Sequence, residues 1–444
     1  MPDLSRRRLL QAAASLPILP PAVGFAQAGA VFDADVAIIG AGAAGLAAAR
    51  ELQALGKSFV LIEARDRVGG RVFTDTSLGE KFDAGAVYIH WAEKNPWAAI
   101  ARDLGFATVD SDKVPSDFRL FENGARTQRS SRRGYAVLTE RFDTDVAPVP
   151  DVPLTEHVST DGDDVFRAVQ GMSRMSLGEE AERVSSLDYA RLWSGLDLLL
   201  PDGYGALVER FARDIPVRLS TPVRAIDWSG AGVAIETDRG TLRTRSVIIT
   251  VSVGVLRAQK IRFTPPLPDD TLGGLEGLGM GALTKIALRF DGDRFDVSPG
   301  TDLWELIGPR ATFDFECWPF DRNVVVVIFG GDHAREVVRL GEAGAVALAL
   351  EQFGKLVGRD PLEAFRGGRL AAWSEDPYAM GCYSHALPGH ANARAKLATP
   401  VAERIFFAGE ATGGGGDDFG GAMTAGGAYL AGQEAARKAA RVKA

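Results

Sequence analysis

Three glycines with the spacing G-x-G-x-x-G follow a short apolar strand and open an alanine-rich stretch. They are Gly40, Gly42 and Gly45, with Ala44 before the third. In such a turn the first glycine permits a tight bend and the second lets the backbone approach a pyrophosphate. The third allows the helix to pack closely on the strand, and the helix N-terminus favours negative charge. Glu63 ends the next strand, where a carboxylate binds ribose hydroxyls and disfavours a 2′-phosphate. The pattern therefore predicts FAD or NAD.

The run after Glu63 narrows this choice through a resemblance. Its last residues are Gly69, Gly70 and Arg71, where glycine backbone can meet a cofactor and arginine can neutralise phosphate. The run resembles that of the flavin-containing amine oxidase family, which includes monoamine oxidases, polyamine oxidases and lysine-specific histone demethylases. The resemblance implies FAD, with Arg65 near its adenosine part and Val223 also at the cofactor. Further matching segments are 247–268, the strand containing Lys285, 373–384 and 407–412; the match is weakest between 92 and 200.

The segment near the C-terminus fits the same cofactor. Gly409 and Glu410 follow an apolar strand, and the carboxylate is placed to accept hydrogen bonds from ribityl hydroxyls. A helix beginning near Thr424 and Ala425 would point its N-terminal N–H groups at the ligand and stabilise the anionic charge of a reduced flavin. Glycines 426–427 weaken such a helix, so we expect the backbone to approach something closely there.

Lys285 is the first candidate for chemistry. It lies in the run 283–290, where alternation places it with Arg289 on the face opposite Ile286. This pattern alone predicts that Lys285 faces solvent. The resemblance implies instead a lysine that reaches flavin N5 through a water. A buried ammonium near N5 could stabilise superoxide or position the water that hydrolyses the imine, and our hypothesis is the oxygen role.

Aromatic residues are the candidates for the walls of a substrate slot. Trp373 and Tyr383 match aromatic positions of the family, although core packing is the commonest fate of such residues. Monoamine oxidases pair two tyrosines, whereas the second position here is Thr424, as in many polyamine oxidases and the demethylases. His90 resembles a histidine that polyamine oxidases place near their substrate. Trp91 stands where the family usually has glycine, which departs from the polyamine oxidase pattern.

The chain contains two cysteines, Cys317 and Cys382. Cys382 occupies the position from which monoamine oxidases link sulfur to the flavin. Three alternatives are open: a thioether to FAD, a free buried thiol, or a disulfide between the two cysteines. No group of cysteine and histidine has the spacing of a zinc site.

The elements predict an α/β fold in which a Rossmann-type, glutathione-reductase-like FAD-binding domain is interleaved with a substrate domain of mixed sheet and helices. The predicted FAD-binding domain comprises residues 33–91, 205–300 and 391–441, and the substrate domain comprises 92–204 and 301–390. The clearest predicted strands are 36–39, 59–62, 247–251, 283–290 and 405–407, and the clearest predicted helices are 343–357 and 424–441.

Residues 1–28 resemble a twin-arginine signal peptide. Arginines 6–8 precede an apolar stretch from 12 to 25, and Ala26-Gln27-Ala28 offers a cleavage site. A membrane anchor is the alternative, but Pro17, Pro20 and Pro21 interrupt the apolar run that it needs. We therefore expect export to the periplasm without a stable membrane anchor.

The composition excludes one class of partner but does not identify a substrate. A net charge of −8 over 444 residues disfavours nucleic acid as a partner. The resulting prediction is an amine oxidase that takes a hydride from the amine α-carbon, releases aldehyde after imine hydrolysis, and reduces oxygen to hydrogen peroxide. The amine is predicted to be a polyamine or a primary or secondary amine. Alternatives are an exported L-amino-acid oxidase, a dehydrogenase feeding a cytochrome, and a flavoprotein kept as an interaction module. In the amino-acid oxidase, Arg119 or a residue of the variable region would bind the substrate carboxylate.

Overall fold

The computed structural model describes residues 32–443, apart from 115–116, 128–131, 143–146, 159–162, 308–310 and 415–417. The predicted signal peptide, residues 1–28, lies outside the described residues. Across the described chain, no helix combines the length and apolar character needed to cross a lipid bilayer.

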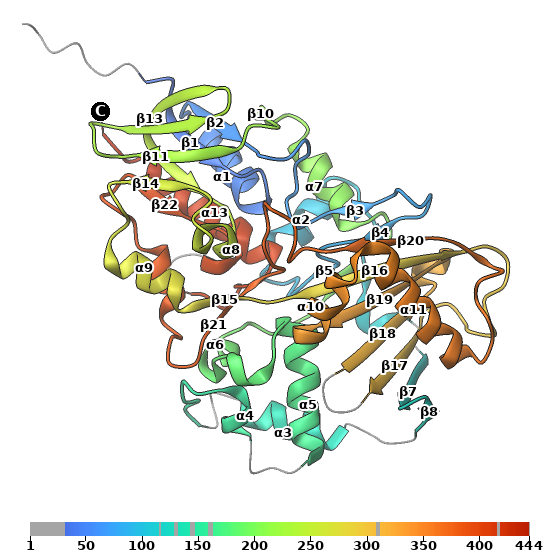
Figure 1. The fold of residues 1–444 in the computed structure, drawn as a ribbon. Coiled ribbons are helices and arrows are strands. Elements are labelled where there is room, and N and C mark those ends of the chain that lie inside the picture. Colours follow the sequence, from blue (N-terminus) through green and yellow to red (C-terminus); the bar gives the residue numbers. More distant parts are fainter. Residues whose placement is uncertain are drawn as a thin grey trace, which may run out of the picture. The chain divides into compact units, whose positions relative to one another are not determined.

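An eight-stranded sheet carries the glycine-rich turn (Figure 1). Its order is β10 (Val217–Arg218), β2 (Phe59–Ile62), β1 (Ala34–Ile39), β13 (Gly240–Ile249), β12 (Val233–Thr237), β11 (Val223–Asp227) and β14 (Arg262–Thr264), with β22 (Ile405–Phe407) also paired to β13. The pairs β10–β2, β2–β1, β1–β13 and β13–β22 are parallel, as in a dinucleotide-binding sheet.

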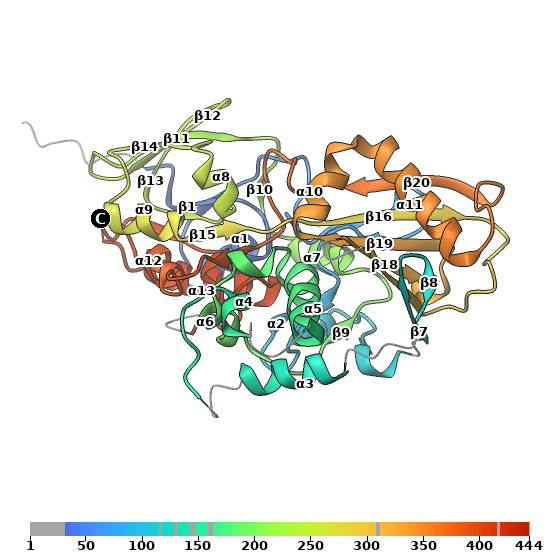
Figure 2. The same ribbon diagram turned by 60° about the horizontal axis from the view of Figure 1, so that its bottom comes forward.

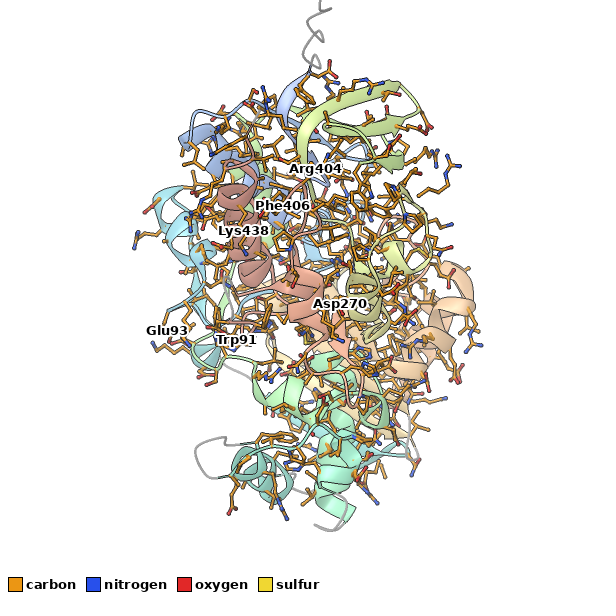
Figure 3. The ribbon with its side chains drawn as sticks, turned by 90° about the vertical axis from the view of Figure 1, so that its left-hand side faces the viewer. Trp91, Glu93, Asp270, Arg404, Phe406 and Lys438 are labelled. Atoms are coloured by element: carbon orange, nitrogen blue, oxygen red, sulfur yellow. The ribbon has the colours of Figure 1, made fainter. Side chains whose placement is uncertain are left out.

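Both faces of the parallel strands are covered. Ile38, Ile248 and Phe406 pack on one face against α1 (Ala43–Ala54) and α13 (Ala425–Ala439), with α2 (Pro96–Asp103) and α7 (Tyr204–Ala212) beside them. Ile39, Val247 and Ile405 pack on the other against α8 (Val253–Arg257), α9 (Asp269–Glu276) and α12 (Ala393–Ala398). Burial on both faces explains why the strands are almost continuously apolar. In Figure 3 the labels Phe406 and Lys438 mark β22 and the neighbouring α13.

A seven-stranded sheet forms the second framework. Its order is β20 (Phe365–Ala371), β16 (Leu283–Phe290), β19 (Val324–Gly330), β18 (Ala311–Cys317), β17 (Thr301–Ile307), β7 (Asp117–Glu122) and β8 (Ala125–Arg126). The pair β17–β7 is parallel and the others are antiparallel. One face packs against α10 (Gly331–Arg339) and α11 (Gly341–Val357), which Figure 2 shows beside the sheet.

The remaining elements connect these sheets. A helical segment contains α3 (Arg132–Arg141), α4 (Leu154–His157), α5 (Asp163–Met172) and α6 (Ser186–Ala190). Short strands form three small sheets: β3 (Thr74–Asp75) with β4 (Phe82–Asp83); β5 (Tyr88–Ile89) and β6 (Val109–Asp110) with β9 (Leu198–Leu199); and β15 (Leu278–Met280) with β21 (Ser384–Ala386).

The predicted strands at 59–62, 283–290 and 405–407 match β2, β16 and β22, and the α/β fold class is confirmed. The helix predicted at 343–357 matches α11. The sequence analysis did not predict α10, which precedes α11 and is separated from it by the left-handed Gly341 (φ +70°). The strands of each sheet come from segments far apart in the sequence, and β16 pairs in the seven-stranded sheet. The domain boundaries themselves stay a prediction.

Close packing of α1 on α13 yields a test of the first framework. A Cβ built at Gly432 of α13 would lie 2.0 Å from the carbonyl oxygen of Ala44, so Gly432→Ala forces two backbones apart. We expect the free energy of unfolding to fall by roughly 1–3 kcal/mol. Gly273→Ala in α9 is the matched control, because a Cβ there meets no atom within 4 Å. Urea denaturation measures both variants, and equal midpoints would contradict this account of the packing.

Candidate functional site

One cavity of about 1370 Å³ collects almost all of the predicted site residues. It is larger than the roughly 300–1,000 Å³ of pockets for small ligands, so it has room for a dinucleotide and a substrate together. The predicted residues that line it are Gly40, Gly42, Ala44, Glu63, Arg65, Gly70, Arg71, Val223, Cys382, Gly409, Glu410, Thr424, Ala425, Lys285, Trp373, Tyr383 and His90. Gly45 does not line it.

The glycine-rich turn forms one end of the cavity. Gly40 has φ +103°, which permits the bend, and a Cβ at Gly45 would lie 1.8 Å from the carbonyl oxygen of Gly40. Gly45 therefore serves the packing of α1 on its strand, as predicted. A Cβ at Gly42 would come no closer than 3.9 Å to another part of the protein, so the space beside Gly42 belongs to the cavity. No side chain caps the N-terminus of α1, which leaves its N–H groups available to an anion.

Glu63 holds the glycine-rich turn and the following segment together. It is 5% exposed, one carboxylate oxygen accepts from the Ala41 N–H, and the other accepts from the Arg65 N–H, both at 2.8 Å. The Arg65 guanidinium pairs with Asp376 and lies 5.5 Å from the centre of the Tyr378 ring. These groups fit the adenosine half of a dinucleotide, because the cavity offers a carboxylate, a guanidinium and an aromatic face at one end.

Glu410 lies in a buried network of charges. Its carboxylate accepts from Arg71 Nη1 at 3.0 Å and from the N–H and hydroxyl of Ser384 at 3.0 and 2.8 Å. Arg394, which is 1% exposed, donates to the Ser384 hydroxyl and forms two hydrogen bonds to Asp188. The network fixes the Glu410 carboxylate in the cavity wall. Its contact with a ribityl chain stays a prediction.

The N-terminus of α13 faces the cavity through Thr424 and Ala425. The Thr424 hydroxyl caps the helix by accepting from the Gly427 N–H at 3.0 Å. Glycines 426–427 are required by protein contacts: a Cβ at Gly426 would lie 2.5 Å from Asn95, and one at Gly427 would lie 1.8 Å from the Gly421 oxygen. The close approach that the sequence predicted is therefore between two parts of the chain.

Lys285 is 5% exposed and lines the cavity. Strand alternation correctly placed Lys285 on the face of the strand opposite Ile286. The prediction from pattern alone that this face meets solvent was wrong, because at Lys285 it lies in the wall of the cavity. The ammonium donates to the carbonyl oxygens of Asp83 and Gly85 at 3.0 and 2.8 Å, which leaves one of its three N–H groups without a bond in the structure. Burial lowers the pKa of Lys285, while the nearby Glu316 and Asp83 carboxylates oppose this shift.

Trp373 and Tyr383 both line the cavity, as predicted for walls of the substrate slot. The Trp373 indole N–H donates to the carbonyl oxygen of Ala84 at 2.8 Å, which fixes the ring against the segment that also holds Lys285. The Tyr383 hydroxyl lies 3.4 Å from the Met175 carbonyl oxygen, and burial raises its pKa. The structure places both rings in the cavity wall and leaves their roles as predictions.

Both cysteines are free and buried, so the disulfide alternative was wrong. Cys382 lines the cavity, whereas Cys317 packs in the core between the seven-stranded sheet and helices α10 and α11. One side chain therefore lies in the cavity wall and the other in the hydrophobic core. Burial raises the pKa of the Cys382 thiol to about 12.

His90 and Trp91 lie at another part of the cavity wall. His90 Nδ1 lies 2.8 Å from the carboxylate of Asp197, which also accepts from the Trp91 N–H at 3.0 Å. The Trp91 ring packs edge-on against Trp193 with centroids 6.0 Å apart. Figure 3 shows Trp91 and Glu93 on the loop after β5. Arg119 does not line the cavity and bonds to Asp117 at 2.8 Å, so an amino-acid oxidase would need another residue of the variable region for the substrate carboxylate.

The sequence analysis missed an acidic and aromatic part of the wall. Asp314 and Glu316 of β18, Trp304 of β17 and Tyr88 of β5 all line the cavity. In the run Thr-Phe-Asp-Phe-Glu-Cys the acids alternate with apolar residues, which is also typical of a strand with one face in water. The alternation was a signal for a strand, but it gave no indication that its polar face is covered.

Comparison with known proteins supports a flavin dinucleotide as the ligand of this cavity. The family model for flavin-containing amine oxidoreductases matches residues 43–189 and 187–440. Human lysine-specific histone demethylase 2 is 29% identical over 454 residues, which cover 91% of this chain and 53% of that protein, so the chain spans about half the length of that relative. A probable polyamine oxidase 4 of Arabidopsis thaliana is 28% identical over 424 residues, covering 85% of this chain and 82% of the relative.

Solved structures show the same fold. A putrescine oxidase bound to putrescine has a TM-score of 0.76 at 21% identity, covering 91% of this chain and 98% of that one. Cyclohexylamine oxidase from Brevibacterium oxydans IH-35A has a TM-score of 0.75 at 22% identity, covering 92% and 99%. The family and the fold together imply a flavin cofactor, and the uncapped helix, the bare Gly42 and the size of the cavity fit one.

Gly42 provides a test of this fit. Its φ of −80° is accessible to alanine and its Cβ would come no closer than 3.9 Å to another part of the protein, so Gly42→Ala should leave the stability of the cofactor-free protein unchanged. The added methyl group occupies the space where backbone should meet the pyrophosphate, and we expect flavin affinity to fall at least about tenfold. Gly45→Ala, which clashes within the protein, should lose stability as well. Flavin titration and thermal denaturation of the apoprotein separate these effects, and unchanged flavin affinity in Gly42→Ala would contradict the assignment.

Proposed function

The chain belongs to the family of flavin-containing amine oxidoreductases, and from this membership we propose that it is an exported, FAD-dependent amine oxidase. It would oxidise a polyamine or a primary or secondary amine to an imine, which water hydrolyses to an aldehyde, with oxygen as the electron acceptor and hydrogen peroxide as the second product. The proposal includes Cys382 as the residue placed for a thioether to FAD and the twin-arginine segment as the signal for transport to the periplasm.

The observation that carries the proposal is the convergence of separate segments on one cavity. The nucleotide-binding end, Lys285 and the aromatic residues Trp373 and Tyr383 are distant in sequence, yet all line it. A bound flavin supplies the redox chemistry, accepting the α-hydride at N5 and returning the electrons to oxygen. The protein's part is to hold the amine beside the cofactor and to place charge where oxygen is reduced.

Lys285 suits the second task. Two carbonyl oxygens fix its ammonium, the Trp373 ring is anchored to the same segment, and the remaining N–H is free to hold a water or an oxygen species. A preorganised positive charge in a dry site stabilises developing negative charge more than water does. Tyr383 and Trp373 would bound the slot for the neutral amine, and His90 with Asp197 would contact the part of the substrate farther from the nucleotide end.

The direct test is product analysis with spermidine, a simple monoamine and a panel of L-amino acids. We expect an amine, in air, to yield hydrogen peroxide and aldehyde in equal amounts. Amine oxidation that needs added cytochrome c and forms no peroxide would show that the acceptor is wrong. Oxidation of amino acids alone would replace the proposal with an amino-acid oxidase, and no oxidation of any substrate by flavin-loaded protein would refute it.

Replacement of Lys285 tests the oxygen role. In Lys285→Met, reoxidation of the reduced flavin by oxygen should slow at least about tenfold, while anaerobic reduction by amine changes little. Lys260→Met is the matched control, because Lys260 is an exposed lysine that lines the same cavity. Stopped-flow absorbance measures the two half-reactions separately. Equal slowing of both would mean that Lys285 does not act on oxygen.

A further inference from the structure

Three carboxylates lie on adjacent strands of the seven-stranded sheet, on the face turned away from α10 and α11. Asp314 and Glu316 belong to β18, and Asp302 of β17 is the cross-strand partner of Glu316. Asp314 and Glu316 line the cavity. The residues that alternate with them, Phe313 and Phe315, pack in the core on the other side. The strand thus presents two neighbouring acids to the cavity.

Asp314 is buried, Asp302 and Glu316 are half-buried, and Lys285 is a cation near Glu316. Asp314 is 7% exposed, and its Oδ1 atom has no hydrogen-bond partner. In the described part of the chain, no ion pair joins Asp302, Asp314 or Glu316 to a basic residue. Burial raises the pKa of Asp314 and of Glu316 and raises that of Asp302 to about 7. The positive charge of Lys285 partly opposes this shift at Glu316. A further positive charge bound beside Asp314 would stabilise the ionised form of these acids.

Aromatic side chains complete the acidic wall. Trp304 is the cross-strand partner of Asp314 and lines the cavity. Tyr88 lines it as well, and the charge of Glu316 is the largest of the effects that raise the pKa of its hydroxyl. Ring faces next to carboxylates are a favourable setting for an ammonium group, because both attract a cation. Among the described residues, no three side chains are grouped as ligands of one metal ion.

The register of the sheet sets the distance from the acids to the reactive region. Lys285 pairs with Ile328, and Ile328 pairs with Asp314, so the three side chains share one face in one row. Lys285 and Asp314 are therefore two strand spacings apart, about 10 Å. The apolar Ile328 lines the cavity between them. A substrate lying along this row would need a reacting C–N bond at one end, an apolar linker, and a positive charge at the other.

We propose, building on the amine oxidase function, that Asp314 and Glu316, backed by Asp302, bind a second ammonium group of the substrate. The enzyme then selects aliphatic diamines and polyamines over monoamines. One ammonium is held at the acidic wall beside Trp304 and Tyr88, while the other nitrogen, as the neutral amine, is presented for oxidation near Lys285. Specificity comes from charge at a distance from the reacting bond.

The test compares putrescine with n-pentylamine, in which a methyl group replaces the second ammonium. Calorimetry on dithionite-reduced holoenzyme measures binding without turnover, and anaerobic stopped-flow of the oxidised enzyme measures flavin reduction. We expect putrescine to bind wild type at least about tenfold more tightly than n-pentylamine. Asp314→Asn and Glu316→Gln should each remove most of this difference and leave n-pentylamine affinity unchanged. Asp117→Asn, at an exposed acid on β7 of the same sheet, should change neither.

The outcomes separate the inference from the proposed function. Equal wild-type affinities for the two amines, or variants that weaken both equally, would overturn the acidic site even if both amines reduce the flavin. Charge-dependent binding of putrescine without flavin reduction by any amine would uphold the site and refute the amine oxidase function. The wild-type comparison needs no variant, so it decides the matter even if a substitution prevents folding.

Discussion

A buried chain of charges holds the cavity wall together. Asp188, Arg394, Ser384, Glu410 and Arg71 lie far apart in the sequence, yet each is hydrogen-bonded to the next. The chain joins α6, β21, α12, the turn after β22 and the segment after the glycine-rich turn. Removing one partner of such a pair typically costs about 3–5 kcal/mol, because a charge is then buried alone. The network also holds the wall residue Cys382, whose carbonyl oxygen accepts from Arg71.

Three charged side chains outside this network have incomplete hydrogen bonding or no ion-pair partner, and they lie close to one another. Lys285 keeps one N–H free, Asp314 has an unpaired oxygen, and Glu316 has no ion-pair partner in the described chain, and all three line the same cavity. Strand alternation places them there, since one face of β16 and β18 is core and the other is wall. Because buried polar groups are usually hydrogen-bonded, these groups are best understood as contacts for ligands.

Much of the framework could be predicted from the sequence. The strands β2, β16 and β22 and the glycine-rich turn follow from local pattern, because a glycine turn between strand and helix has few alternatives. The acidic wall could not be predicted, because Asp314 and Glu316 alternate with phenylalanines as they would on a solvated sheet. What covers that face, including Tyr88 from a distant segment, is a tertiary fact. For the same reason Lys285 needed the family resemblance. The sequence predicted a close approach at glycines 426–427 but could not indicate that Asn95 and Gly421 make it.

The central claim is that this cavity holds a flavin that an amine reduces. The most direct measurement is the visible spectrum of the purified protein without oxygen, before and after addition of spermidine. The account predicts a flavin band that bleaches on addition of the amine and returns when air is admitted. A protein with no flavin band, even after reconstitution with FAD, would contradict the account at its foundation.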